Sequence, residues 1–209
     1  MNIALIAATG NIGQRILNEA LDRGHTVTAL VRDPEKVTIT HKNLSVSQID
    51  IMNPDDVGSK ISGHDAVVSA YGPGWTNVNL LVDATKSLIA GFKKATVPHL
   101  VAVGGSGSLE VAPGVQLVDT LPEEWKGIAT AHRDTLALYK AEEELPWSYC
   151  SPAAYIEPGE RTGSFRTGGT SLLVDAGGTS RISMEDFAIA IVDEVEKKAH
   201  LNRQFTVAY

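Results

Sequence analysis

The chain has 209 residues, of which 43% are hydrophobic and 21% charged, and its formal net charge is −7. This composition suffices for a globular core, while the acidic balance disfavours general affinity for nucleic acid, whose phosphates need a basic surface. No segment approaches the roughly 18 consecutive apolar residues of a membrane span, and no basic leader precedes the first apolar run. Cys150 is the only cysteine, which excludes an intramolecular disulfide bond and a cysteine-based zinc site. We therefore expect a cytoplasmic protein with no membrane or nucleic-acid partner.

Segments typical of strands and of helices alternate along the first 150 residues. Short apolar runs predict strands at residues 3–7, 26–31, 44–49, 66–70, 99–103 and 147–150. Apolar residues at helical spacing predict helices that begin at Asn11, after Asn53 and near Val78, and another at about residues 129–144. Gly24 is placed to end the first of them. Because strands this apolar need cover on both faces, the order predicts an α/β fold of the Rossmann type, a doubly wound parallel sheet.

The last third of the chain has a different character. Residues 158–178 are rich in glycine and threonine, and the run from Ser183 to Asp186 resembles a capping box that opens a helix to about residue 197. Residues 205–208 form a short final strand in this prediction, and residues 109–127 form an irregular excursion long enough to be a lid. We therefore predict one domain over residues 1–209, with residues 151–185 forming most of a small C-terminal lobe on the substrate side.

Three of the predicted strands end in loops of small residues, at residues 7–13, 69–74 and 103–108. An ordinary strand-to-helix turn explains the first loop alone. Since the carboxyl ends of parallel strands meet at the edge where ligands bind, a dinucleotide laid across that edge explains all three. The residues that we expect to bind it from these loops are Thr9, Gly10, Asn11, Ile12, Gly13, Ser69, Ala70, Tyr71, Val103, Gly104 and Gly105.

The residue after the second predicted strand indicates which dinucleotide binds. Arg32 stands where an NAD-specific site places an acidic residue against the ribose 2′-hydroxyl, and a guanidinium there can clasp the 2′-phosphate of NADP. The neighbouring Asp33 supports NAD instead, although it precedes Pro34 and can simply begin a turn. We favour NADP(H) over NAD(H). Asp50 is a candidate acceptor for the adenine amino group, and Ile51 is assigned to the same site.

Several catalytic signatures are absent from the sequence. No tyrosine is followed by a lysine four residues later, which disfavours a carbonyl–alcohol reductase of the standard short-chain kind. There is also no Gly-x-Ser-x-Gly elbow, no His-Glu-x-x-His and no Cys/His cluster, so we expect no metal.

The chain resembles a known family over nearly its whole length. From residue 7 through Arg32-Asp33-Pro34 it resembles the atypical short-chain dehydrogenases of the NAD(P)H-binding, NmrA-like group. It is more similar still to bacterial NADH-flavin reductases, relatives of mammalian biliverdin-IXβ/flavin reductase, at Ser-Pro-Ala (151–153), Arg-Thr-Gly-Ser-Phe-Arg (161–166) and Ile-Ser-Met-Glu-Asp-Phe-Ala (182–188). The resemblance implies a Rossmann fold, a reduced nicotinamide cofactor and permissive reduction of flavins or similar flat acceptors.

The resemblance also supplies two catalytic candidates. Ser106 matches an active-site serine and can orient the nicotinamide or the acceptor; its alternative is a turn serine that bonds its own backbone. His132 matches a histidine in the next helix and can supply a proton to a reduced acceptor, because a histidine pKa is expected to be near neutral; its alternative is a structural histidine. The chain departs from the family at Ala7, which replaces the usual first glycine. It departs again at Ala153, which replaces a histidine that contacts substrate in the mammalian relatives. We assign Pro152 and Ala153 to cofactor binding.

The sequence thus predicts an enzyme that transfers hydride from NADPH to FMN, FAD or another planar acceptor. Such a reaction needs juxtaposition and exclusion of water more than it needs a strong acid. Trp75 and Trp125 are candidates to stack on the acceptor, with core packing as the alternative. The protein is expected to be a monomer or a homodimer. Two alternative functions stay open: a redox sensor that binds NADP without turnover, and a sugar-nucleotide epimerase or dehydratase.

Overall fold

A large, mostly parallel sheet organises the computed structural model, which describes residues 1–74 and 77–209. The strands of this sheet are β1 (Asn2–Ile6), β2 (Thr26–Val31), β3 (Leu44–Gln48), β4 (Ala66–Ser69), β5 (Leu100–Val103), β8 (Trp147–Ser151), β10 (Arg166–Gly168) and β12 (Arg203–Ala208). Within the described residues their order is β10-β12-β8-β5-β4-β1-β2-β3. Seven of these eight strands are parallel, and the edge strand β10 is antiparallel to β12.

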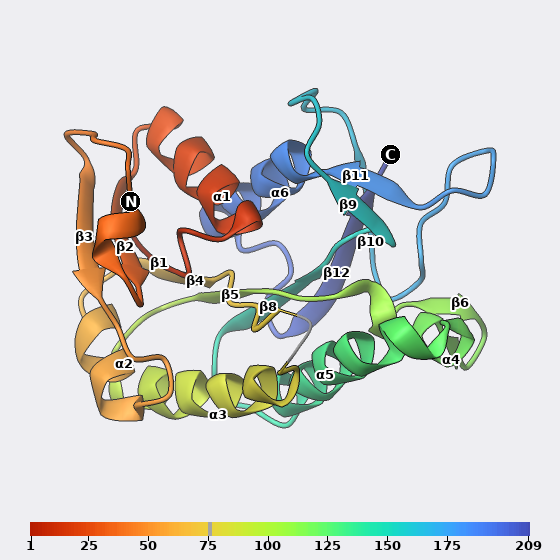
Figure 1. Cartoon of the computed structure of the whole chain (residues 1–209), viewed down its shortest axis with the longest axis horizontal. Helices are drawn as coiled ribbons and strands as arrows, with labels where there is room; N and C mark the ends of the chain where they lie inside the picture. Colours follow the sequence, from red (N-terminus) through yellow and green to blue (C-terminus); the bar gives the residue numbers. More distant parts are fainter. Residues whose placement is uncertain (75–76) are drawn as a thin grey trace.

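Helices cover both faces of this sheet (Figure 1). The pair α1 (Asn11–Asp22) and α6 (Met184–Lys197) lies on one face, and α2 (Pro54–Ile61), α3 (Asn79–Lys94) and α5 (Glu123–Lys140) lie on the other. Each face has its own apolar core, one containing Leu17 and Ile191 and the other containing Leu88 and Leu136. The predicted Rossmann-type, doubly wound parallel sheet is therefore confirmed.

The chain changes direction in the sheet at β1. This strand pairs with β2 on one side and with β4 on the other. After β1 the chain crosses to α1 on one face, and after β4 it crosses to α3 on the opposite face. The two loops therefore diverge at the carboxyl edge and leave a crevice between them, which is the general place for ligands in such sheets.

Local capping explains where several helices begin and end. Gly24 ends α1 with a φ of +81°, and the Asn53 side chain accepts hydrogen bonds from the first-turn N–H groups of α2. At α6 the Ser183 hydroxyl accepts from the N–H of Asp186, as a capping box requires. The reciprocal bond is missing, because the N–H of Ser183 donates to the hydroxyl of Tyr209 instead. The predicted box is thus half formed.

The stretch predicted to be irregular is ordered. It contains the antiparallel pair β6 (Glu110–Ala112) and β7 (Val115–Gln116), turned at Gly114 with a φ of +75°, and the short helix α4 (Leu117–Thr120). Helix α5 begins at Glu123, well before the predicted residue 129, so Trp125 lies on a helix rather than in a loop. Trp75, the other candidate for stacking, lies outside the described residues.

The C-terminal part between β8 and α6 adds a second, smaller sheet. Its strands β9 (Tyr155–Glu157) and β11 (Arg181–Ser183) are parallel to each other. Among the described helices, none combines the length and the apolar character needed to cross a membrane.

Candidate dinucleotide-binding site

A cleft of about 970 Å³ lies along the carboxyl edge of the sheet. It extends from the turn after β1, across the ends of β2 and β3, to the residues that follow β4, and its size suits a small-molecule ligand. Six of the residues predicted to bind the cofactor line it together: Thr9, Gly10, Arg32, Asp50, Ile51 and Tyr71. These six residues therefore lie on one continuous surface.

The turn after β1 is tighter than its sequence suggests. Ala7, at the position of the usual first glycine, has a φ of +63°, in the left-handed region that alanine adopts only at some energetic expense. Its carbonyl accepts a hydrogen bond from the N–H of Gly10 at 3.1 Å. A Cβ on Gly13 would lie 2.2 Å from the same carbonyl oxygen, so only glycine lets the helix approach the strand this closely.

The N-terminus of α1 fits an anion. Gly10 is its N-cap residue, no side chain caps the helix, and its first turn has no acidic residue. The N–H groups at the start of a helix lack intrahelical partners and carry a partial positive charge. Asn11, Ile12 and Gly13 thus offer backbone donors to a diphosphate, which matches the role predicted for them.

The part of the cleft at the ends of β2 and β3 is lined by charged groups. Arg32 is exposed there, while Asp33 forms an ion pair with Lys36 at 3.5 Å. One carboxylate oxygen of Asp50 accepts a hydrogen bond from the N–H of Met52 at 3.0 Å, so part of this side chain holds its own turn. Burial raises the pKa of Tyr71, and the positive charge of Arg32 acts against that shift.

The loop after β5 is shaped by two close contacts. A Cβ on Gly104 would lie 2.0 Å from the ring of Tyr149, and a Cβ on Gly105 would lie 2.7 Å from the ring of His132. The buried Tyr149 hydroxyl in turn donates a hydrogen bond to the backbone carbonyl of His132 at 2.8 Å. Glycine is therefore needed here for packing against α5 and β8. Four predicted cofactor residues line a cavity of about 10 Å³ nearby: Ile51, Ser69, Tyr71 and Val103.

The two catalytic candidates lie on either side of this loop. Ser106 begins a 3₁₀ turn (Ser106–Ser108) directly after Gly105 and is half-buried. Burial lowers the pKa of His132 to about 4, and its Nδ1 is buried without a hydrogen-bond partner among the described residues. The expectation of a near-neutral pKa was wrong, because the half-buried ring packs against Gly105 and its Nδ1 is shielded from water. His132 is neutral at pH 7.

Other predicted residues lie further from the cleft. Pro152 and Ala153 are buried at the end of β8 and do not line it. Ala153 packs in the core that also contains Ala8, with the half-buried Ala70 at its margin.

Gln204, which sequence reasoning missed, connects the strand ends near this site. Its amide donates to the hydroxyls of Ser108 at 2.8 Å and Ser151 at 2.9 Å, and so joins the 3₁₀ turn to β8. No local pattern signals this role.

Relatives of known structure share this architecture. A "putative exported protein" from Burkholderia pseudomallei is 46% identical, with both chains covered completely and a TM-score of 0.92. A "putative epimerase" from Bacteroides thetaiotaomicron is 41% identical, with 100% of this chain and 96% of that chain covered and a TM-score of 0.94. SP1627 of Streptococcus pneumoniae, a "putative NADH-flavin reductase", is 33% identical, with 100% and 99% covered and a TM-score of 0.88.

Sequence comparison leads to the same group of proteins. YwnB of Bacillus subtilis, an uncharacterized protein, is 38% identical over 99% of this chain and 98% of its own length. The profile of the NAD(P)H-binding family matches residues 7–195, which include the turn after β1, the cleft and most of the C-terminal part. The chain therefore belongs to the NAD(P)H-binding family, within the NmrA-like, atypical short-chain dehydrogenase group that its sequence resembles.

Proposed function

We propose that the protein is a reductase that binds NADPH and passes hydride to a flavin or a similar planar acceptor. The observation that carries this proposal is the composition of the cleft. Its phosphate-binding turn is free of acidic side chains, and its adenosine half presents the Arg32 guanidinium. Membership of the NAD(P)H-binding family supports the use of a nicotinamide cofactor.

Each part of the edge has a separate task in this proposal. The N–H groups of Asn11, Ile12 and Gly13 hold the diphosphate, and Arg32 binds the 2′-phosphate through paired hydrogen bonds. The loop at Gly104 and Gly105, which packs against Tyr149 and His132, faces the nicotinamide with its backbone in this proposal. When bound, the reduced nicotinamide supplies the hydride.

The acceptor is expected to need little help from an acid. His132 is neutral at pH 7, and the chain has no tyrosine followed by lysine four residues later. Hydride transfer to a flavin or quinone depends mainly on juxtaposition, which suits such a site. Ser106 orients the nicotinamide or the acceptor in this proposal.

The named relatives support different parts of the proposal. SP1627 carries the name of a flavin reductase that uses NADH, so the preference for NADPH depends on Arg32 alone. The Bacteroides relative carries the name of an epimerase, which makes a sugar nucleotide the second candidate substrate. The Burkholderia relative carries the name of an exported protein, and the cytoplasmic location of this chain stays a prediction.

The test is an assay of NADPH oxidation by the purified protein with FMN, FAD and a small quinone. We expect oxidation above the rate without protein for at least one acceptor. Tight NADPH binding with no oxidation across these acceptors would contradict the proposal and favour a redox sensor. A thermal shift produced by a sugar nucleotide in the presence of cofactor, again without oxidation, would favour an epimerase or dehydratase.

A further inference from the structure

Residues 158–165, which connect β9 to β10, form a segment that we call the strap. The strap lies outside helices and strands. The residues from Pro158 to Ser164 are exposed, so apolar burial contributes little to holding them, while Phe165 at the end of the strap packs against the apolar core. Polar contacts to α1 and to the N-terminal end of α6 hold it instead. These contacts join Gly159 N–H to Glu185, Glu160 carbonyl to Ser183 hydroxyl, Arg161 to Glu19, and both Thr162 hydroxyl and Gly163 N–H to Asp186.

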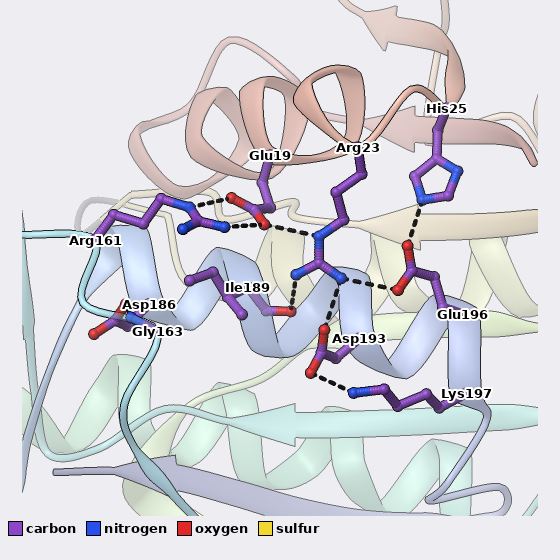
Figure 2. A network of polar contacts seen from close by, with 10 residues as sticks. All are labelled: Glu19, Arg23, His25, Arg161, Gly163, Asp186, Ile189, Asp193, Glu196 and Lys197. Atoms are coloured by element: carbon purple, nitrogen blue, oxygen red, sulfur yellow. Dashed lines mark hydrogen bonds and ion pairs between the residues drawn. The ribbon is translucent and has the colours of Figure 1, made fainter.

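The contact between Arg161 and Glu19 has two-pronged geometry (Figure 2). The guanidinium Nε donates to one carboxylate oxygen of Glu19 at 2.8 Å, and Nη2 donates to the other at 2.9 Å. Glu19 is 4% exposed, whereas Arg161 is 57% exposed. A nearly buried carboxylate on α1 is therefore covered by a cation that arrives from the strap. Hydrogen bonding from Arg161 is also the main cause of the lowered pKa of Glu19.

A second chain of contacts leads from the phosphate-binding turn to the strap. Arg15 donates through Nη1 to the carbonyl of Asn11 and through Nε to Glu185, both at 3.0 Å. The other carboxylate oxygen of Glu185 accepts the N–H of Gly159 at 2.8 Å. The first residue of α1 and the strap are thus joined by three consecutive hydrogen bonds.

The helices beneath the strap have contacts of their own. Arg23 at the end of α1 donates to Asp193 at 2.7 Å and to Glu196 at 2.9 Å, both on α6 (Figure 2). These bonds do not involve the strap. Arg23 also donates to Glu19 at 2.8 Å, so this carboxylate has a partner on α1 besides Arg161, and the contacts between α1 and α6 do not depend on the strap.

We propose that the Glu19–Arg161 pair clasps the strap onto the cofactor-binding helix, and that binding of NAD(P)H and docking of the strap stabilise each other. Arg161 is then a positioning residue, since it acts through the strap and touches neither cofactor nor acceptor. Because the strap directly follows β9, which begins four residues after β8 ends, docking also fixes the position of β9 beyond the carboxyl end of β8. The effect on acceptor turnover rests on the proposed reductase function; the effect on cofactor binding does not.

Thermodynamic linkage makes the effect of strap docking on NADPH affinity equal in size to the effect of NADPH on strap docking. If the docked strap raises the affinity for NADPH by some factor, NADPH raises the docking equilibrium by the same factor. The geometry supplies the differential contact that such coupling needs, because the Asn11 carbonyl bonded by Arg15 belongs to the turn that holds the diphosphate.

The experiment uses the full chain and two readouts that need no acceptor. Hydrogen exchange of strap amides is followed by mass spectrometry with and without saturating NADPH, and the dissociation constant of NADPH is measured by titration. The variants are Arg161→Ala, Arg161→Lys and Glu19→Gln. The control is Lys94→Ala, which removes an exposed ion pair with Asp55 on the other face of the sheet.

We expect NADPH to slow exchange in the strap of the wild type. Arg161→Ala should weaken NADPH binding by about five- to tenfold and abolish the protection. Arg161→Lys keeps the charge and loses the two-pronged bond. Its NADPH affinity and its strap protection should lie between those of the wild type and of Arg161→Ala. The lysine variant keeps the test valid if Arg161→Ala fails to fold. Equal NADPH affinity in wild type, Arg161→Lys and Glu19→Gln, or strap exchange unaffected by NADPH in the wild type, overturns the proposal.

Measurements of turnover distinguish a failure of the clasp proposal from a failure of the proposed reductase function. With a working acceptor, Arg161→Ala should raise the acceptor KM more than it lowers kcat, since it disturbs the position of β9 and not a reacting group. If the wild type oxidises no NADPH, the reductase proposal fails while the exchange and titration results still decide the clasp.

Discussion

Gly13 packs directly against the carbonyl group of Ala7, so closely that a Cβ on Gly13 would lie 2.2 Å from the carbonyl oxygen. Ala7 itself holds a left-handed backbone, with a φ of +63°. At these two residues α1 approaches the turn after β1 closely. The backbone of Ala7 is strained, and Gly13 has no room for a side chain. Each of these properties can be tested by substitution.

Gly13→Ala should destabilise the fold and weaken cofactor binding. The added methyl group forces α1 away from β1, and overpacking of this kind costs about 1–3 kcal/mol of unfolding free energy. Chemical denaturation and NADPH titration measure the two effects. Gly10→Ala is the matched control for stability, because its Cβ would meet the Ala7 oxygen at an ordinary 3.5 Å. Equal losses of stability in the two variants would contradict the packing argument.

Ala7→Gly should leave the free energy of unfolding within about 0.5 kcal/mol of the wild type. Relief of the left-handed backbone gains about 1 kcal/mol, and the greater freedom of glycine in the unfolded chain removes about as much. Ala7→Val should instead lose more than about 1 kcal/mol, since a β-branched residue tolerates positive φ poorly. Denaturation midpoints of the three proteins provide the comparison. A valine variant as stable as the glycine variant would show that the left-handed conformation is not required.

Local sequence signals predicted the order of strands and helices along the chain, because each signal depends on only a few neighbouring residues. β2 occupies the predicted residues 26–31, and α2 starts behind Asn53 as expected. The β6–β7 hairpin was missed although Pro113-Gly114 marks its turn, since strands of two or three residues carry little pattern.

Long-range polar contacts could not be predicted from one sequence. His25 is buried against Glu196, which is 171 residues away. Arg161 was noted only as part of a family motif, and its partner Glu19 is 142 residues away. For the same reason the burial of His132, which decides its charge, was invisible: it depends on the loop at Gly105 packing onto α5.

Arg32→Ala should weaken NADPH binding by about 10- to 100-fold, the equivalent of two charge-assisted hydrogen bonds, and should change NADH binding little. Titration of both cofactors against wild type and variant gives the ratio. Asp33→Asn is the control, because Asp33 lies beside Arg32 but pairs with Lys36. An unchanged preference for NADPH in Arg32→Ala would refute the assignment of the 2′-phosphate site.

Acid should destabilise the protein through two buried histidines. Burial lowers the pKa of both His99 and His132 to about 4, below the ordinary 6.5. Between pH 6.5 and 4 the unfolded chain therefore binds protons that the folded protein does not. The contribution of these two histidines to the unfolding free energy is constant above pH 6.5 and falls below it, by on the order of 2 kcal/mol per histidine at pH 5.

Urea denaturation of wild type and His132→Phe at pH 7.5 and pH 5.0 measures this contribution. The phenylalanine ring keeps most of the volume and does not titrate, so the variant should lose less stability between the two pH values than the wild type. Parallel losses would mean that His132 is not buried in its neutral form.

Gly105→Ala and changes at His132 should be strongly coupled. Gly105 has an extended backbone, with a φ of −129°, which alanine adopts without strain. The effect of the substitution must therefore come from the contact, in which the new Cβ would lie 2.7 Å from the imidazole ring. Gly105→Ala should cost about 1–3 kcal/mol in the wild type and much less in a His132→Ala background, where the space is free. Additive losses of unfolding free energy would show that the loop and the ring each adjust independently of the other.

Substitutions at His132 can distinguish a structural role of its ring, which supports the loop at Gly105, from a chemical role in the proposed reaction. If His132 only supports the loop that faces the nicotinamide, His132→Phe should keep turnover near the wild-type level while His132→Ala lowers it. If a ring nitrogen touches the acceptor, both variants should lose turnover alike, and the pH profile should still show no ionisation of His132 above about pH 5, because its pKa is about 4. We expect the first result, since the imidazole is neutral, its Nδ1 is buried, and the ring fills the space that Gly105 leaves.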